Sequence, residues 1–184
     1  MEQWVDRMPK EIERKYLIRE DGREYAEEGF FSLCSSIESL AERVFAQGKP
    51  VRQGYMPTRK GADLAKELGL EIELHIQEAR LREITGKFYL TLKSGGDIVR
   101  DEIEHEILEK AFNEYWPYTE GRRVQKIRLE LPYDNHTVEI DLYTDRDLIM
   151  AEVETLTISE AEELRPIGLD VTAVEKYKNR NLAK

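Results

Sequence analysis

Charged and apolar residues alternate through Lys10-Glu-Ile-Glu-Arg-Lys-Tyr-Leu-Ile18, near the start of the chain. Side chains alternate between the two faces of an extended strand, so Glu11, Glu13 and Lys15 would share one face while Ile12 points to the other. The two carboxylates suit a hard divalent cation, which binds through oxygen, and the lysine beside them suits a phosphate. The stretch therefore predicts a strand with phosphate and metal chemistry on one face. A strand face exposed to water often has the same pattern, so this motif alone does not decide the function.

The same alternation of charged and apolar residues recurs along most of the chain and predicts an antiparallel α+β protein. Strands are expected at 10–19, 51–56, 71–84, 88–94, 98–107, 121–131, 137–143 and 148–155. Turn residues at 85–87, 95–97 and 134–136 join neighbouring strands. Helices are expected from a capping box at Ser35 to Gly48, over 107–115, from Ser159 to just before Pro166, and over 173–182, while 57–69 is a loop or a short helix. Eight strands are enough for a sheet to close on itself.

The charges of these strands are sorted by sign. Basic side chains that project from shared faces are Arg80, Arg82, Lys93, Lys126 and Arg128; acidic ones are Glu139, Asp141, Glu152 and Glu154; and one strand is mixed, with Arg100, Glu102 and Glu104. If these faces point inward, a cationic wall and an anionic wall surround a wet interior. The cations would then hold phosphate oxygens, and the carboxylates would hold Mg²⁺ or Mn²⁺. An ordinary sandwich with these charges on its exterior is the alternative.

Composition limits the choice of partners and compartment. The 184 residues are expected to form one domain, 1–184, with 1–8 as an N-terminal extension. A net charge of −10 disfavours general binding to nucleic acid or anionic membranes. The chain has no apolar stretch long enough to cross a bilayer, no apolar h-region near Met1, and a single cysteine, Cys34, which excludes an internal disulfide. These features predict a cytoplasmic protein without nucleic-acid or membrane partners.

Taken together, these motifs resemble the CYTH domain, also called the triphosphate tunnel metalloenzyme family. The family signature Glu-x-Glu-x-Lys matches Glu11, Glu13 and Lys15. Later family strands are similar to Gln53-Gly-Tyr55, Arg80-Leu-Arg82, Tyr89-Leu-Thr-Leu-Lys-Ser94, Arg100-Asp-Glu-Ile-Glu104, Lys126-Ile-Arg128, Glu139-Ile-Asp141 and Glu152-Val-Glu154. The tail from Asp170 to Ala183 resembles the closing segment of the family. It departs from the pattern at Ala173-Val174, where a Gly-Asp pair is more usual, and so leaves open how that segment meets the tunnel.

The resemblance implies a closed eight-stranded antiparallel β-barrel that forms a tunnel, with helices packed outside, a triphosphate substrate, and Mg²⁺ or Mn²⁺ as cofactor. On this basis the substrate-binding residues would be Lys15, Arg80, Arg82, Lys93, Arg100, Lys126 and Arg128. The metal ligands would be Glu11, Glu13, Asp141, Glu152 and Glu154. Lys15 and Glu152 are the candidate catalytic residues, and Glu152 would orient the attacking water directly or through a second metal.

The leading hypothesis is metal-dependent hydrolysis of a triphosphate to a diphosphate and orthophosphate. Inorganic tripolyphosphate is favoured because it needs only the charged tunnel, whereas thiamine triphosphate or a nucleoside triphosphate needs an aromatic or apolar shelf. One alternative is a class IV-type adenylate cyclase, although Trp4 to Pro9 replaces a Phe-containing stretch found in cyclase members. The other alternative is a polyphosphate-binding module without turnover. The sequence does not fix the oligomeric state, and a homodimer stays open.

Overall fold

The structure of the protein is a computed structural model that describes residues 10–95 and 99–183, with only the backbone of Lys10 and Glu11. The expected extension at 1–8 and part of the expected turn at 95–97 lie outside the described residues. Eight long strands form the main sheet: β1 (Lys10–Glu20), β3 (Lys49–Met56), β4 (Glu78–Ile84), β5 (Lys87–Lys93), β6 (Val99–Ile107), β7 (Arg123–Tyr133), β8 (His136–Tyr143) and β9 (Leu148–Thr155). Two short strands, β2 (Arg23–Glu24) and β10 (Leu169–Asp170), pair with β1.

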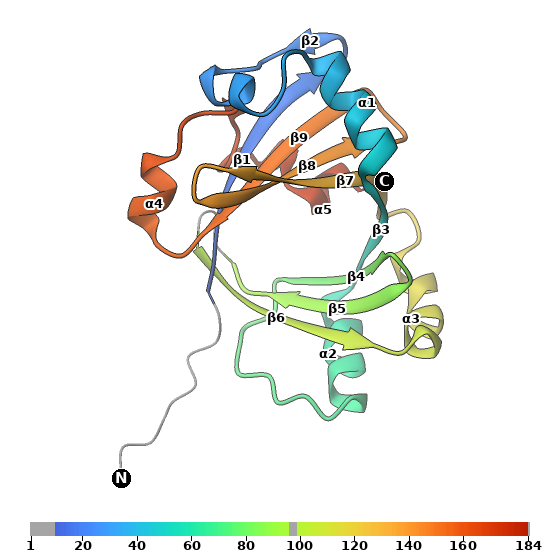
Figure 1. The fold of residues 1–184 in the computed structure, drawn as a ribbon. Coiled ribbons are helices and arrows are strands. Elements are labelled where there is room, and N and C mark those ends of the chain that lie inside the picture. The colour runs from blue at the N-terminus through green and yellow to red at the C-terminus, as the bar shows by residue number, and fades with distance from the viewer. Residues whose placement is uncertain (1–9, 96–98, 184) are drawn as a thin grey trace.

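The eight long strands are hydrogen-bonded in a ring, which we call the strand ring (Figure 1). Antiparallel neighbours follow the order β1-β6-β5-β4-β3-β7-β8-β9, and β9 pairs again with β1. The pairing of β1 with β6 is short, because it joins only Lys10–Ile12 to Val99–Asp101. Farther along β1, the C-terminal strand β10 pairs with Tyr16 and Leu17. These pairings confirm the predicted antiparallel α+β sheet, with two additional short strands.

Turn chemistry explains the tight connections between neighbouring strands. Thr85 and Gly86 form a two-residue loop between β4 and β5, and both have positive φ values, of 51° and 76°. Two consecutive positive φ values match the twist of a β-hairpin, and glycine adopts the second without steric cost. Asp134, also at positive φ, begins the corresponding two-residue loop between β7 and β8. Both predicted hairpins are therefore confirmed.

The prediction of one strand over 71–84 is wrong in its first half. β4 begins only at Glu78, and residues 71–77 form an irregular segment. Apolar and charged residues alternate in this segment, but it does not pair with a strand. It follows α2 (Thr58–Glu67), and its Ile72 and Ile76 pack against the core that α2 shares with β4 and β5. The uncertain region 57–69 is a helix, and Gly69 takes up a positive φ just beyond its end.

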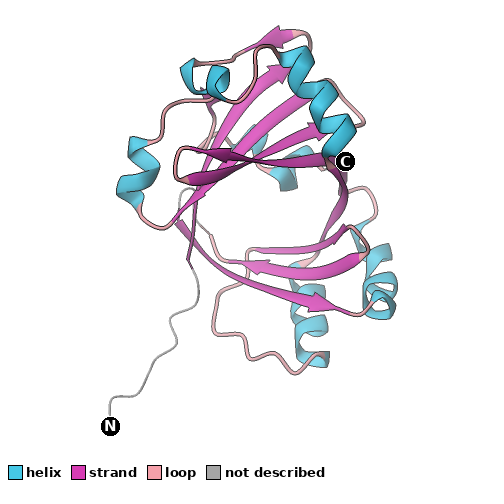
Figure 2. Ribbon diagram, viewed as in Figure 1, coloured by secondary structure: helices cyan, strands magenta, loops and turns pink. Residues whose placement is uncertain are grey.

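The other helices lie outside the strand ring (Figure 2). They are η1 (Glu28–Ser32), α1 (Ile37–Gln47), α3 (Glu109–Tyr115), η2 (Trp116–Thr119) and α4 (Ile158–Glu163). The N-cap of α1 is Ser36 and not Ser35, since its side chain accepts a hydrogen bond from the amide of Ser39. The expected helix over 173–182 is divided into η3 (Glu175–Tyr177) and α5 (Asn179–Leu182). No helix in the described ranges is long and apolar enough to span a membrane.

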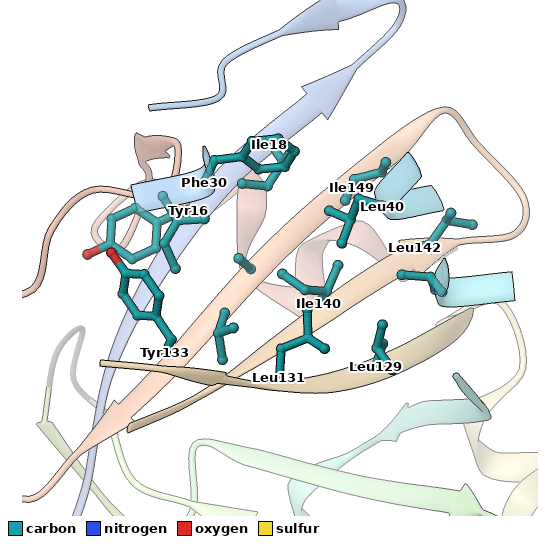
Figure 3. Packing of buried hydrophobic residues seen from close by; sticks show 14 of the residues in the cluster. Tyr16, Ile18, Phe30, Leu40, Leu129, Leu131, Tyr133, Ile140, Leu142 and Ile149 are labelled. Atoms are coloured by element: carbon teal, nitrogen blue, oxygen red, sulfur yellow. The ribbon is translucent and has the colours of Figure 1, made fainter. Parts of the chain in front are cut away.

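Two hydrophobic cores fix the outer faces of the strand ring. α1 and η1 cover the outer face of β1, β7, β8 and β9, where Leu40 and Phe30 belong to one buried cluster with Ile18, Ile140 and Ile149 (Figure 3). α2 and α3 cover the opposite half of the ring, where Leu64 packs with the β4 and β5 side chains in a second cluster. Because the apolar side chains of each strand point outward into these cores, the alternate charged side chains point inward.

Candidate active site

A cavity of about 960 Å³ lies on the inner side of the strand ring. Its wall includes most of the charged residues that the sequence singles out. They are Glu13, Lys15, Arg80, Arg82, Lys93, Arg100, Arg128, Glu152 and Glu154. The strand ring therefore brings residues from six strands, separated by up to about 140 positions in the chain, around one space.

Glu152 occupies the centre of the strongest ion-pair network. One carboxylate oxygen accepts from Lys15 Nζ at 2.7 Å, and the other accepts from Arg128 Nη2 at 2.9 Å. Although burial by itself raises the pKa of Glu152, the surrounding charges of Lys15, Lys126 and Arg128 hold it well below its usual range. Burial lowers the pKa of Lys15, but Glu152 and Glu13 outweigh it and the net pKa is raised. Both groups are therefore charged at neutral pH.

Arg80 and Arg82 are the two cations that β4 contributes to the cavity lining. Arg82 Nη2 donates to Glu104 at 2.7 Å, and Arg80 Nη2 donates to Thr91 at 3.1 Å. Burial and the neighbouring guanidinium of Arg80 lower the pKa of Arg82. The Nε atoms of both arginines are buried and have no hydrogen-bond partner within the described part of the chain. Unmet buried donors on adjacent cations favour an anionic ligand in this part of the cavity.

Lys93 and Arg100 complete the cationic lining from β5 and β6. Lys93 is buried and its Nζ lies 2.7 Å from a Glu102 oxygen. Arg100 lies opposite Glu11 in the β1–β6 pairing, which places it next to the Glu-x-Glu strand. The cations are thus distributed around the cavity and not clustered on one wall.

The best-placed carboxylates for a divalent cation are Glu13 and Glu154. They lie directly opposite each other on β1 and β9, and both line the cavity. Like charges in this arrangement are unfavourable unless a cation lies with them. Glu11 also belongs to β1, but its side chain is outside the described part. Among the described side chains, no three from His, Cys, Asp or Glu are gathered closely enough to hold a metal ion.

Lys126 and Asp141 are placed differently from the other candidates. Both are almost completely buried, and neither is among the described residues that line the cavity. Asp141 accepts from Arg128 Nε at 2.7 Å and from Arg128 Nη2 at 2.6 Å, and it also pairs closely with Lys126. The two-point contact fixes the plane of the Arg128 guanidinium. The structure thus puts this pair behind Arg128 and not at the cavity surface.

Burial and the neighbouring Arg128 lower the pKa of Lys126 to about 8. Between about pH 8 and about pH 10, Lys126 is largely deprotonated in the folded protein but stays protonated in the unfolded chain. Because the unfolded state binds more protons in this range, the free energy of unfolding rises with pH. We therefore expect wild-type protein to become more stable relative to K126M over this range. Urea unfolding of both proteins at several pH values measures this difference, and a constant difference would contradict the lowered pKa.

The C-terminal segment, residues 169–183, covers one end of the strand ring. There the inward-facing residues change from charged to apolar: Leu17 follows Lys15 on β1, and Met150 precedes Glu152 on β9. These side chains and Tyr143 pack against residues of the C-terminal segment, namely Val171, Tyr177 and Leu182. The segment also adds Thr172, Lys178 and Asn179 to the cavity lining. Lys176 does not reach the cavity, because it is exposed and pairs with Glu20 at 2.7 Å.

Several lining residues had no site role assigned from the sequence. They are Tyr55, Glu78, Glu102, Glu104, Glu139, Thr172, Lys178 and Asn179, together with a group at the rim that includes His136, Leu156 and Glu160. The strand alternation contained the signal for the strand glutamates, since Glu78, Glu102 and Glu104 share a face with a chosen arginine and Glu139 shares one with Asp141. The tail residues had no comparable signal, because short helices and loops have no two-residue period.

The fold and the cavity define a class of protein in which a ring of antiparallel strands surrounds a charged interior suited to a polyanion. The chain is 37% identical over 141 residues to an inorganic triphosphatase of Nitrosomonas europaea, and the match covers 73% of this chain and 83% of the relative. The crystal structure of the inorganic triphosphatase NE1496 is similar over 94% of this chain and 93% of that chain, with 28% identity and a TM-score of 0.52. No protein-family model matches the chain. With this relative and this fold, the chain belongs to the CYTH, or triphosphate tunnel metalloenzyme, family.

Proposed function

We propose that this protein is a divalent-metal-dependent triphosphatase that hydrolyses inorganic tripolyphosphate to diphosphate and orthophosphate inside the strand ring. The observation that carries the proposal is the cationic lining of the cavity, in which the buried Nε donors of Arg80 and Arg82 have no partner among the described residues. A polyphosphate would satisfy these donors and would replace carboxylates as the partner of the other cations. The inorganic triphosphatase relative supports hydrolysis as the reaction.

The cations of the cavity would bind the phosphate chain. We assign this role to Lys15, Arg80, Arg82, Lys93, Arg100 and Arg128. Phosphoryl transfer depends mainly on positioning and on stabilising the charge that spreads over the phosphate oxygens. Lys126 and Asp141 would contribute indirectly by holding Arg128 in its orientation.

Glu13 and Glu154, with Glu11, would hold Mg²⁺ or Mn²⁺. When bound, such a cation would neutralise phosphate charge and polarise the P–O bond that is cleaved. Carboxylate oxygens are the ligands that these hard cations prefer. Glu152 would remain ionised beside Lys15 and would accept a hydrogen bond from the attacking water, which keeps the water oriented toward phosphorus.

The shape of the site favours tripolyphosphate over triphosphates with an aromatic head group. Tyr55 is the one Phe, Tyr or Trp side chain among the described residues that line the cavity. Phe88 and Tyr115 belong to the outer core with α2 and α3, and Tyr143 packs with the C-terminal segment.

Phosphate release from a panel of substrates tests the proposal. Tripolyphosphate, ATP and thiamine triphosphate should each be assayed with Mg²⁺, with Mn²⁺ and with a chelator. We expect the highest kcat/KM with tripolyphosphate and no release with chelator. Formation of cyclic AMP from ATP as the main reaction would establish the cyclase alternative. Tight tripolyphosphate binding with no phosphate release under either metal would establish the binding module.

A further inference from the structure

A chain of hydrogen bonds links the C-terminal segment to the centre of the cavity. Asn179 Nδ2, at the start of α5, donates to Glu152 Oε1 at 3.1 Å. The hydroxyl of Tyr143 on β8 donates to Asn179 Oδ1. Glu152 Oε1 also receives Lys15 Nζ at 2.7 Å, while Arg128 binds the other carboxylate oxygen. Asn179 is therefore the neutral donor in an otherwise ionic network around Glu152.

The chemistry of these partners fixes the orientation of the Asn179 amide. An ionised carboxylate only accepts hydrogen bonds, so the NH₂ group must face Glu152. The amide oxygen then faces Tyr143, whose hydroxyl is the donor. Burial, together with the negative charges of Asp141 and Glu152, raises the pKa of Tyr143, so this hydroxyl keeps its proton.

We infer that Asn179 is a positioning residue for Glu152, and that Tyr143 orients Asn179 for this role. The inference rests on the proposed function, in which Glu152 orients the attacking water. A bound polyphosphate would draw Lys15 and Arg128 toward its own oxygens, and both ionic partners of Glu152 would then be shared with the ligand. Asn179 carries no charge and has no such competing attraction. Its hydrogen bond would therefore hold one carboxylate oxygen in place and leave the other directed toward the water.

The C-terminal segment gives Asn179 a rigid base. Val171 N donates to the Lys15 carbonyl at 2.9 Å, and the Lys15 amide donates to Thr172 Oγ1 at 3.0 Å. Tyr177 and Leu182, which flank Asn179 in the chain, are buried against the apolar end of the strand ring. The segment thus couples the backbone of the Glu-x-Glu-x-Lys strand to the side chain that contacts Glu152.

Steady-state kinetics of N179A with tripolyphosphate test the inference. A misplaced catalytic group typically costs about 10²-fold in rate, so we expect kcat to fall by about 10- to 100-fold while KM changes by less than about threefold. Y143F should lower kcat in the same direction by a smaller factor. N181A is the matched control, because Asn181 also belongs to α5 but, among the described residues, its side chain donates to Glu175 and not to Glu152; it should retain wild-type kcat.

A general loss of stability is separated from positioning by L40A, because Leu40 is fully buried in the outer core under α1 and that core contains no residue of the C-terminal segment. We expect L40A to lower the melting temperature more than N179A does and to retain most of kcat. Equal kcat losses in L40A and N179A, or wild-type kcat in N179A, would overturn the inference. The E152Q variant separates this inference from the proposed function. If E152Q is inactive and N179A is fully active, only the positioning role of Asn179 is rejected. If E152Q is active, the role assigned to Glu152 itself is rejected.

Discussion

Replacement of Glu13 by glutamine is expected to reduce metal-dependent phosphate release from tripolyphosphate by about 10²- to 10³-fold. Glu13 lies opposite Glu154 in the β1–β9 pairing, and both line the cavity. A neutral amide keeps the size of the side chain but removes one of the negative charges that would hold the cation. The fold should persist, because Lys15 keeps its close contact to Glu152 at 2.7 Å, whereas its Nζ lies 3.7 Å from Glu13.

Mn²⁺ binding, measured by calorimetry on the free protein, gives a second readout for E13Q that does not depend on turnover. We expect weaker binding in E13Q and unchanged binding in E106Q. Glu106 is a suitable control because it belongs to β6 but forms only an exposed pair with Lys87, outside the described cavity lining. Wild-type Mn²⁺ affinity and activity in E13Q would exclude Glu13 from the metal site.

Replacement of Arg128 by alanine should abolish activity and also lower the free energy of unfolding by about 3–5 kcal/mol. The Arg128 guanidinium is buried and contacts three carboxylates, those of Glu139, Asp141 and Glu152. Removing it leaves these acids without their shared cation, and two of them, Asp141 and Glu152, are buried. Lys15 and Lys126 would compensate for only part of the loss, since each already pairs with one of the same acids.

Urea unfolding and phosphate release, measured on the same preparation, check both effects of R128A. R128K keeps the charge but cannot reproduce the two-point contact with Asp141, so we expect it to recover more of the stability than of the activity. R43A is the control, because Arg43 is exposed on α1 and donates only to Gln47. A stable and active R128A would show that the buried network contributes neither to folding nor to phosphate binding.

Strand alternation in the sequence was sufficient to predict the strands of the ring and which residues share a face. It works because each strand of the ring has an apolar core on one side and a polar interior on the other, which is the condition for a two-residue period. The same pattern failed at 71–77, where alternation occurs in an irregular segment packed beside α2. A two-residue period shows only which residues are buried, and an irregular segment that packs against a core can have the same period.

Position along the tunnel axis could not be predicted from the alternation. Lys126 and Asp141 share faces with Arg128 and Glu139, yet they lie toward the end of the ring that the C-terminal segment closes. Depth depends on the stagger between strands and on what covers each end, and both follow from tertiary packing. For the same reason the contact of Asn179 with Glu152 joins parts of the chain whose sequences give no sign of proximity.

The charged faces of the ring would bind a polyphosphate and a divalent cation together. Anomalous diffraction from crystals grown with Mn²⁺ and a non-hydrolysable imido analogue of tripolyphosphate would locate both ligands. We predict a manganese peak between the carboxylates of Glu13 and Glu154, with analogue density that contacts Lys15, Arg80 and Arg128. A cavity that stays free of both while they bind elsewhere on the protein would contradict the claim.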